Sequence, residues 1–384
     1  MSKRIAILTG GGHIAALNLG IASIIDNARE KGWTVIGALE GWKGMQDGLF
    51  VNLNLNKDQI TEVSATSGTV IKASRTRPDL DRVAKNVKRF GINAVIAMGG
   101  DDTLGLASEL YETFGVPVVG WPKTMDNDLS NTYFCLGYPS AVHCAAKCIR
   151  ESFVGSYSHN RLALVTMFGR DTDWMVAGAG GYGYADLIIP AENEYFIDDV
   201  YLMMDDVYER NHGHAVVAVA EGAHLRGLES HIQGEEIDEF GHYKFDPHLL
   251  LTYLGRATKR LSKQKHGKEI KTTLISLTYQ LRNGPPVEVD RTLAVEAGKY
   301  CVDMIQEGRK GEMATVTLDG DRLTVKSSVL LKDAAVTRPV KGTGYFDYDK
   351  LQVTEAFFTY ARPFLGEREP RPGYCFSLEM LDGT

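Results

Sequence analysis

Short apolar runs alternate with amphipathic segments along the first third of the chain. Four apolar runs have the length of strands: residues 4–8, 34–40, 93–100 and 116–122. Three segments between them have the apolar spacing of helices with one buried face: residues 16–32, 78–91 and 103–115. Strands that are apolar on both faces and separated by helices are typical of parallel sheets. The pattern therefore predicts a doubly wound α/β domain.

A second series of the same kind begins near Tyr138. Helices are expected at residues 140–155, 173–185 and 197–213, and strands at residues 161–169, 187–192 and 214–223. This predicts a second open sheet, so the fold class is α/β with two doubly wound, Rossmann-like domains whose sheets are mainly parallel. Ligands of such sheets bind beyond the carboxyl ends of the strands, which places the active site in the cleft between the domains.

The domain boundaries follow from the same pattern. Residues 1–138 form the first domain, completed by elements that return from about 286–384, and residues 139–285 form the second. A long helix over 288–308 is expected to pack back on the first domain. Alternation around an Asp-Gly turn predicts a hairpin over 313–331. We expect this hairpin to lie at a subunit contact.

The composition of the chain argues against several classes of protein, among them nucleic-acid-binding and membrane-spanning proteins. The chain has 384 residues, of which 44% are hydrophobic and 24% charged, so it should fold fully. A net charge of -7 argues against a nucleic-acid surface. Five cysteines without paired CxxC spacing indicate reduced thiols. The N-terminal apolar run is too short for a signal peptide, and no run is long enough to cross a membrane, so we expect a cytoplasmic protein.

Two glycine turns follow the first and third of these apolar runs. In the first, Gly10, Gly11 and Gly12 could let backbone N–H groups approach a phosphate, or could simply form a tight turn. The spacing matches neither the dinucleotide nor the Walker motif. The second turn, MGGDDTLG, carries Asp101 and Asp102. Capping of the next helix would explain one acid but does not require two.

A third turn, GWPKTMDNDLSNT, gathers Lys123, Thr124, Asp126 and Asp128 after a buried strand. An exposed acidic loop is one interpretation, since Asp and Asn are ordinary turn residues. Its position at a strand end and its lysine among acids favour a functional site instead.

The motifs GGDDT (99–103) and PKTMDND (122–128) together resemble the phosphofructokinase family in its pyrophosphate-dependent form. Members of that form carry GGDD and PKTIDND, whereas many ATP-dependent members carry GGDG and PGTIDND. Further matches follow in the family's order at residues 67–78, 160–170, 219–223 and 277–294. The resemblance implies a glycolytic kinase. It would transfer a phosphoryl group reversibly, with Mg2+, from diphosphate to the 1-hydroxyl of fructose 6-phosphate, giving fructose 1,6-bisphosphate.

The resemblance also assigns roles. Asp126 would be the general base, Asp101 would support the magnesium ion, and Asp128 would orient the base or metal waters. Arg170 would meet the transferring phosphate and is counted, with Asp126, Lys123 and Asp102, among the catalytic residues. The implied donor-binding set is Gly11, Gly12, Arg75, Gly100 and Lys123. The implied substrate-binding set is Thr124, Asp126, Asp128, Arg161, Phe168, Gly169, Arg170, Glu221, Tyr279 and Arg282.

Asp102 is expected to select the donor. Where ATP-using relatives have glycine, its carboxylate would project into the space of the nucleotide's α-phosphate. Two unit charges at about 4 Å repel by about 4 kcal/mol at an effective dielectric near 20. Pyrophosphate has no third phosphate to be repelled, and Lys123 supplies a compact positive charge for it.

The acceptor is less firmly specified. YQLRNG differs from the family's usual Q-R-G-G form, Thr273 stands where a second interface-borne arginine is usual, and no P-G precedes Asn18. Sedoheptulose 7-phosphate or a polyol is therefore an alternative acceptor, and a catalytically silent phosphate sensor is a further alternative. His13 could contact phosphate or could be structural. Because the counterpart of Arg161 often crosses a subunit interface, the resemblance implies a homodimer or homotetramer.

Overall fold

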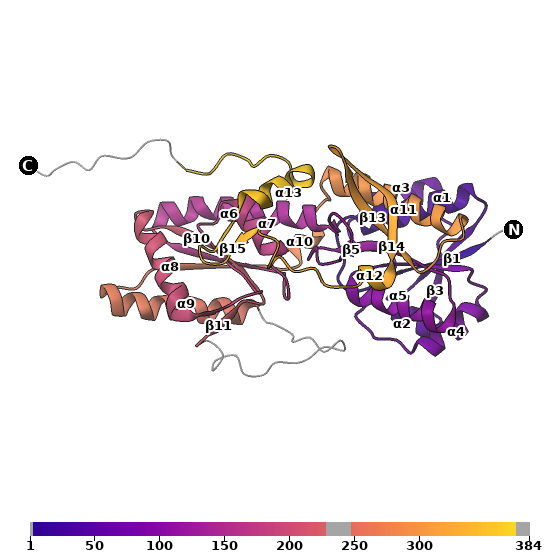
Figure 1. Ribbon diagram of the computed structural model, residues 1–384, viewed down its shortest axis with the longest axis horizontal. Helices are drawn as coiled ribbons and strands as arrows, with labels where there is room; N and C mark the ends of the chain where they lie inside the picture. The colour runs from indigo at the N-terminus through magenta and orange to yellow at the C-terminus, as the bar shows by residue number, and fades with distance from the viewer. Residues whose placement is uncertain (1–2, 228–246, 374–384) are drawn as a thin grey trace, which may run out of the picture.

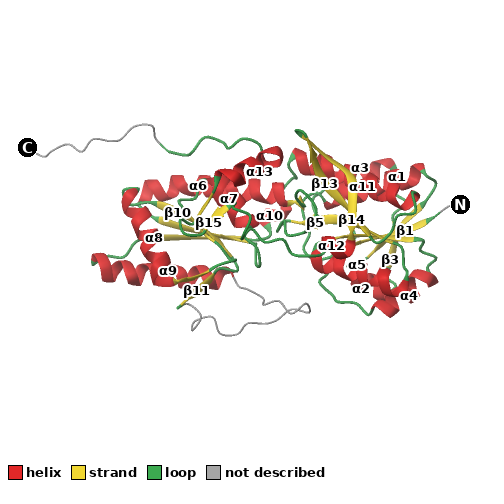
Figure 2. Cartoon of the chain, in the orientation of Figure 1, coloured by secondary structure: helices red, strands yellow, loops and turns green. Residues whose placement is uncertain are grey.

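The computed structural model describes residues 3–227 and 247–373. Two lobes lie side by side, each built on its own sheet with helices on both faces (Figure 1). Figure 2 shows the strands at the centre of each lobe and the helices outside them. The predicted pair of doubly wound α/β domains is confirmed.

The first sheet has the order β14-β13-β5-β4-β1-β2-β3, with β6 paired to β5. Its strands are β1 (Arg4–Thr9), β2 (Thr34–Ala38), β3 (Phe50–Asn52), β4 (Ala94–Gly99), β5 (Val118–Thr124), β6 (Leu136–Gly137), β13 (Glu312–Asp319) and β14 (Arg322–Leu330). All neighbours are parallel except β2 with β3 and β13 with β14. The expected Asp-Gly hairpin is β13 and β14, and it extends this sheet beside β5.

Helices cover both faces of the first sheet. They are α1 (Leu17–Glu30), α2 (Trp42–Asp47), α3 (Lys57–Ala65), α4 (Leu80–Arg89), α5 (Asp101–Phe114), α11 (Glu288–Gln306) and α12 (Leu331–Ala334). Alternate residues of β1 point to opposite cores: Ile5 and Ile7 to one, Ala6 and Leu8 to the other. As expected, α11 returns to the first lobe and packs on α1.

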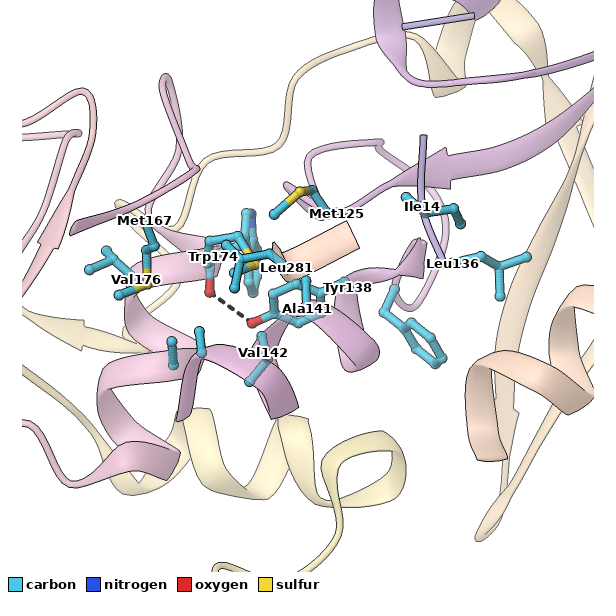
Figure 3. Packing of buried hydrophobic residues seen from close by; sticks show 14 of the residues in the cluster. Ile14, Met125, Leu136, Tyr138, Ala141, Val142, Met167, Trp174, Val176 and Leu281 are labelled. Atoms are coloured by element: carbon cyan, nitrogen blue, oxygen red, sulfur yellow. Dashed lines mark hydrogen bonds between the residues drawn. The ribbon is translucent and has the colours of Figure 1, made fainter. Parts of the chain in front are cut away.

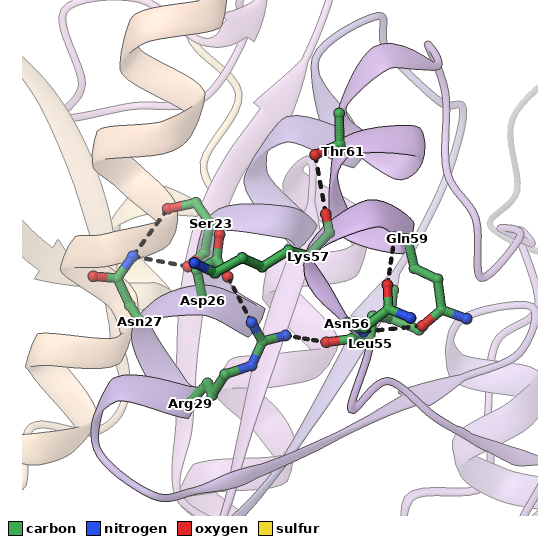
Figure 4. A network of polar contacts seen from close by, with 9 residues as sticks. All are labelled: Ser23, Asp26, Asn27, Arg29, Leu55, Asn56, Lys57, Gln59 and Thr61. Atoms are coloured by element: carbon green, nitrogen blue, oxygen red, sulfur yellow. Dashed lines mark hydrogen bonds and ion pairs between the residues drawn. The ribbon is translucent and has the colours of Figure 1, made fainter.

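Polar contacts fix the start of α3 beside α1. The Asn56 side chain accepts from the Gln59 backbone N–H, and the Gln59 side chain accepts from the Asn56 N–H, which is a complete capping box (Figure 4). Arg29 donates to the Leu55 carbonyl and pairs with Asp26 at 3.3 Å. The loop leading to α3 is thereby attached to the end of α1.

The second sheet is wholly parallel, with the order β12-β7-β10-β8. Its strands are β7 (Leu162–Met167), β8 (Leu187–Ile189), β10 (Ala215–Ala220) and β12 (Thr272–Leu277). The helices of this lobe are α6 (Tyr138–His159), α7 (Trp174–Gly183), α8 (Ile197–Arg210), α9 (Pro247–His266), α10 (Gln280–Asn283) and α13 (Glu355–Leu365). Two small ribbons are added, β9 (Glu194–Phe196) with β11 (His224–Arg226), and β15 (Phe346–Asp347) with β16 (Gln352–Val353).

One apolar cluster joins the two lobes. Figure 3 shows Ile14, Met125 and Leu136 of the first lobe with Met167 and Val176 of the second. At its centre the Tyr138 hydroxyl donates to the Trp174 carbonyl at 2.8 Å. Tyr138 begins α6, which packs on α7 of the second lobe.

The C-terminal elements divide between the lobes. The sequence placed all of 286–384 with the first domain, but β16 contacts α7 and α13 contacts α6 (Figure 1). The apolar face of α13 explains this position, because Phe358 packs on the ring of Tyr182 and Tyr360 on that of Trp174, both in α7. No helix in the described ranges is long and apolar enough to span a bilayer.

Candidate active site

A cleft of about 1260 Å³ opens between the lobes. It lies beyond the carboxyl ends of β1, β4 and β5 of the first lobe and β7, β10 and β12 of the second. The residues that follow these strand ends and line the cleft are Gly11, Asp101, Asp126, Arg170, Glu221 and Tyr279. The parallel strands of the two sheets thus direct their polar strand-end residues at one cleft.

The glycine turn after β1 is held by hydrogen bonds from Lys123. The Lys123 ammonium donates to the Gly10 carbonyl at 3.0 Å and to the Gly12 carbonyl at 2.6 Å. Gly11 has φ of 70°, and a Cβ on Gly12 would lie 1.4 Å from Arg282 Nη1. Burial, with Arg282 and Arg75 nearby, lowers the pKa of Lys123 to about 7. The turn therefore needs glycine to admit Arg282 from the opposite lobe.

The tandem acids form the first turn of α5. Gly100 is the N-cap and no side chain caps the helix, so the capping interpretation of the tandem acids is wrong. Asp101 is half-buried, Asp102 is exposed, and both line the cleft. The positive end of the helix dipole favours carboxylates here.

Asp126 and Asp128 are partly buried at the end of β5. Oδ1 of each is shielded from solvent and accepts no hydrogen bond within the described residues. Burial raises the pKa of both carboxyls, that of Asp128 to about 8, with Asp126 and Asp101 adding like-charge repulsion. The interpretation of this turn as an exposed acidic loop is therefore wrong. A carboxylate of a cleft-lining residue that is not already engaged by the protein is suited to accept a substrate proton.

The second lobe contributes an arginine, an acid and an aromatic ring. Arg282 is 8% exposed, donates from Nε to the Met125 sulfur at 3.0 Å, and lies over the Phe168 ring at 4.6 Å. Burial raises the pKa of Glu221 to about 7, and the neighbouring Asp126 adds to this effect. Tyr279 is 63% exposed at the cleft.

The acidic residues of the cleft suit a hard divalent cation held together with a phosphate. Asp101, Asp126 and Asp128 line the same cleft, and Asp101 is close enough to raise the pKa of the other two carboxyls. Carboxylate oxygen is the ligand that Mg2+ prefers. Among the described residues, the possible ligand atoms of Asp205, Glu209 and His266 all lie within 4.8 Å of one another. The ligand oxygens of the three cleft acids are not gathered so closely. Such spacing fits an ion that takes one or two carboxylates and completes its shell with phosphate oxygens and water.

Comparison with known proteins agrees with this geometry. The phosphofructokinase family model matches residues 4–305. The chain is 34% identical over 325 residues, 82% of its length and 90% of the relative's, to the pyrophosphate--fructose 6-phosphate 1-phosphotransferase of Dictyoglomus thermophilum. The chain belongs to the phosphofructokinase family. The chain is also similar to an ATP-dependent 6-phosphofructokinase of Corynebacterium efficiens, with 32% identity over 85% of this chain and 92% of that one.

The same fold is found among solved phosphofructokinases. A pyrophosphate-dependent phosphofructokinase from Marinobacter aquaeolei superposes with a TM-score of 0.79, covering 97% of this chain and 94% of that one at 20% identity. A second, from Nitrosospira multiformis, gives 0.80 at 18% identity, covering 98% and 95% of the two chains. At these identities the likeness concerns the fold.

The cleft brings together most residues that the phosphofructokinase resemblance singled out. Those that line it are Gly11, Gly12, Arg75, Gly100, Asp101, Asp102, Lys123, Thr124, Asp126, Asp128, Phe168, Arg170, Glu221, Tyr279 and Arg282. Gly169 does not line it but has φ of 127° and forms the turn between Phe168 and Arg170. Arg161 also lies outside the cleft and donates to the Thr272 carbonyl at 3.3 Å, beside the edge strand β12.

Several lining residues were not predicted from the sequence. Lys72 lines the cleft three residues before Arg75 and has φ of 58°, and His248 reaches it from α9. The signal available for Lys72 was that it shares the segment 67–78 with Arg75 and Arg77, whereas nothing in the sequence pointed to His248. His13 also lines the cleft, where Nε2 lies 2.8 Å from Asn283 Oδ1 and the ring stacks on Tyr279.

Proposed function

We propose that this phosphofructokinase transfers a phosphoryl group reversibly from pyrophosphate to the 1-hydroxyl of fructose 6-phosphate. The observation that carries the proposal is the tandem acid at the start of α5, where Asp102 lines the cleft, together with Lys123, whose ammonium bonds the carbonyls of the glycine turn. The names of the curated relatives support pyrophosphate as donor.

In the proposed mechanism Asp126 accepts the proton of the attacking hydroxyl. Its shielded oxygen lets it approach that proton without first breaking a bond within the protein. Arg170 and Arg75 neutralise the phosphate charge that is shared between donor and acceptor. Arg282 binds the sugar phosphate, and Glu221 accepts from ring hydroxyls. Magnesium, held by Asp101 and the donor, would neutralise charge on the bridging phosphate oxygens.

Turnover measured in parallel with pyrophosphate and with ATP tests the donor, with fructose 6-phosphate and Mg2+ held constant. We expect kcat/KM for pyrophosphate to exceed that for ATP by up to about 10³-fold, as repulsion by Asp102 predicts. Equal use of the two donors would refute the proposal.

An altered acceptor is the second candidate. Thr273 lies in the edge strand β12 with Lys271 just before it, so an arginine that would clamp the sugar phosphate is replaced by a shorter, neutral residue. Ranking kcat/KM over fructose 6-phosphate, sedoheptulose 7-phosphate and a polyol decides between them. A silent phosphate sensor fits less well, because Asp101, Asp126 and Arg170 are all in place in the cleft.

We also propose a homodimer or homotetramer in the cytoplasm. Arg161 lies outside its own chain's cleft and near an edge strand, which supports its delivery to the cleft of a second copy. The Cys135, Cys144, Cys148 and Cys301 thiols form no disulfide, as a reducing compartment requires.

Replacing Asp101 tests the metal. We expect Asp101→Asn to raise the Mg2+ concentration for half-maximal turnover at least about tenfold, because an amide is a weaker ligand than a carboxylate for a hard cation. Mg2+ titrations of initial rate give this value. Asp81→Asn, an exposed acid in the first turn of α4, is the control and should leave it unchanged.

Sugar binding should depend on pH through Glu221. Its pKa of about 7 means that the carboxyl is neutral below this pH and becomes a carboxylate as the pH rises through it. Because a carboxylate accepts hydroxyl hydrogen bonds more strongly than the neutral acid does, we expect KM for the sugar phosphate to fall between pH 6 and pH 8. Glu221→Gln should remove this dependence, and a dependence that persists in the variant would assign it to another group.

A further inference from the structure

The loop that carries the proposed base is held by a segment far along the chain. Residues 334–338, here called the strap, run antiparallel to residues 128–131, with a bridge between Leu129 and Thr337. The Ser130 N–H donates to the Ala334 carbonyl at 3.2 Å, and its hydroxyl donates to the Val336 carbonyl at 2.8 Å. The strap thus lies directly against the continuation of the catalytic turn.

Arg338 ends the strap and contacts the catalytic turn itself. Its backbone N–H donates to the Asp128 carbonyl at 2.7 Å. Its guanidinium donates to the Asn127 carbonyl at 3.0 Å and to the carbonyls of Thr132 and Tyr133 at 3.0 and 3.4 Å. One side chain therefore bonds backbone carbonyls on both sides of the loop that follows Asp126.

The same arginine is attached to the second lobe. Its guanidinium lies over the buried Trp174 ring at 4.5 Å, and the indole N–H of Trp174 donates to the Arg338 carbonyl at 2.7 Å. Trp174 begins α7, four residues after Arg170. Near the same loop, Thr172 donates to the Asp126 carbonyl at 3.4 Å.

Asn127 shows why this loop needs support. It is fully buried with φ of 55°, a conformation that costs energy for a residue with a side chain. Its amide donates to the Tyr360 hydroxyl at 3.1 Å and its side-chain oxygen accepts from the Cys135 N–H at 2.9 Å. Together with Arg338, these bonds hold Asp126 and Asp128 on the cleft side of the turn.

We propose that Arg338 is a positioning residue for phosphoryl transfer, setting the catalytic turn of Asp126 and Asp128 against the Arg170 loop of the other lobe. It lies beyond residues 4–305, the part of the chain that matches the family model. This role rests on the proposed function, in which Asp126 acts as base. A displacement of about 1 Å at reacting groups can cost about 10²-fold in rate, so a support of this kind acts on kcat.

Two variants separate the parts of this role. Arg338→Met keeps the aliphatic length but removes every guanidinium bond, and Arg338→Lys keeps the charge without the planar fork. For both we expect kcat to fall about 10- to 100-fold while KM for each substrate changes less than about threefold. The control is Arg309→Met. In the parent, the Arg309 guanidinium likewise lies over a ring, that of Tyr300, at 5.7 Å, and it donates to Glu312, which does not line the cleft.

Hydrogen exchange supplies a reading that does not depend on turnover. Amides 127–135 should exchange faster in Arg338→Met than in the parent, and should be unchanged in Arg309→Met. The turnover rates of the variants and of the parent are all measured with the donor and acceptor that the parent turns over fastest. If the parent did not turn over pyrophosphate, that result would count against the proposed function. The ratio of kcat in Arg338→Met to kcat in the parent would still decide the role of Arg338. A folded Arg338→Met with parental kcat and parental exchange, or with KM rather than kcat altered, would overturn the inference.

Discussion

We expect Asp126→Asn to lower kcat for phosphoryl transfer about 10³-fold. Asparagine has nearly the same shape, so the Asp126 backbone N–H keeps its bond to the Thr124 hydroxyl at 3.1 Å and the turn keeps its course. The amide cannot accept the proton of the attacking hydroxyl. Steady-state kinetics with both substrates varied should show the loss in kcat, with the two KM values nearly unchanged.

A buried acid outside the cleft is the matched control. Asp205 is 1% exposed and pairs with Lys265 at 2.6 Å and His266 at 2.8 Å between α8 and α9. Asp205→Asn should lower the free energy of unfolding, as loss of a buried ion pair does, but leave kcat at the parental value. General bases contribute about 10²-fold or more to the rate. If Asp126→Asn kept more than about a tenth of the parental kcat, Asp126 would therefore not be the base.

The second large effect concerns the donor. We expect Asp102→Gly to raise the ratio of kcat/KM for ATP to that for pyrophosphate by about 5- to 10³-fold. This range corresponds to a repulsion of about 1 to 4 kcal/mol at 4 Å, from water-like to partly shielded surroundings. Because Asp102 is exposed, water screens its charge and the lower part of the range is favoured. Competition assays with both donors present give the ratio directly.

Asp199→Gly is the control for this change. Asp198 and Asp199 are likewise tandem acids in the first turn of a helix, α8, and Asp199 is exposed as Asp102 is, but neither lines the cleft. The substitution therefore repeats the loss of charge and the gain of a helix glycine without touching the donor. An unchanged donor ratio in Asp102→Gly, with a folded protein, would remove Asp102 from donor selection.

The double variant Asp102→Gly/Lys123→Gly combines two effects. It matches the glycines of ATP-using relatives, so we expect still greater use of ATP. However, it also removes the ammonium that holds the carbonyls of Gly10 and Gly12. Its total activity should fall through loss of the glycine turn, which makes the single Asp102 variant the cleaner measure of the donor effect.

Local patterns were sufficient for most of the fold. Apolar runs followed by amphipathic segments predicted β1, β4 and β5 with their crossover helices, because burial on both faces leaves few polar positions in such strands. The Asp-Gly turn predicted β13 and β14 for a similarly local reason. By contrast, β16 and α13 were placed with the wrong lobe, since their position depends on contacts with α7, more than 150 positions earlier in the chain.

The sequence motifs and their resemblance to the phosphofructokinase family determined which acids and arginines to examine. Most of them line one cleft because the carboxyl ends of parallel strands meet at one edge of a sheet. The sequence could not determine that Gly12 makes room for Arg282, that Lys123 supports the glycine turn, or that Arg161 lies outside the cleft. Nor could it connect Arg338 to the turn of Asp126 and Asp128. These contacts join segments about 100 to more than 250 residues apart, and only the tertiary packing, within each lobe and between the two, brings such distant groups within contact distance.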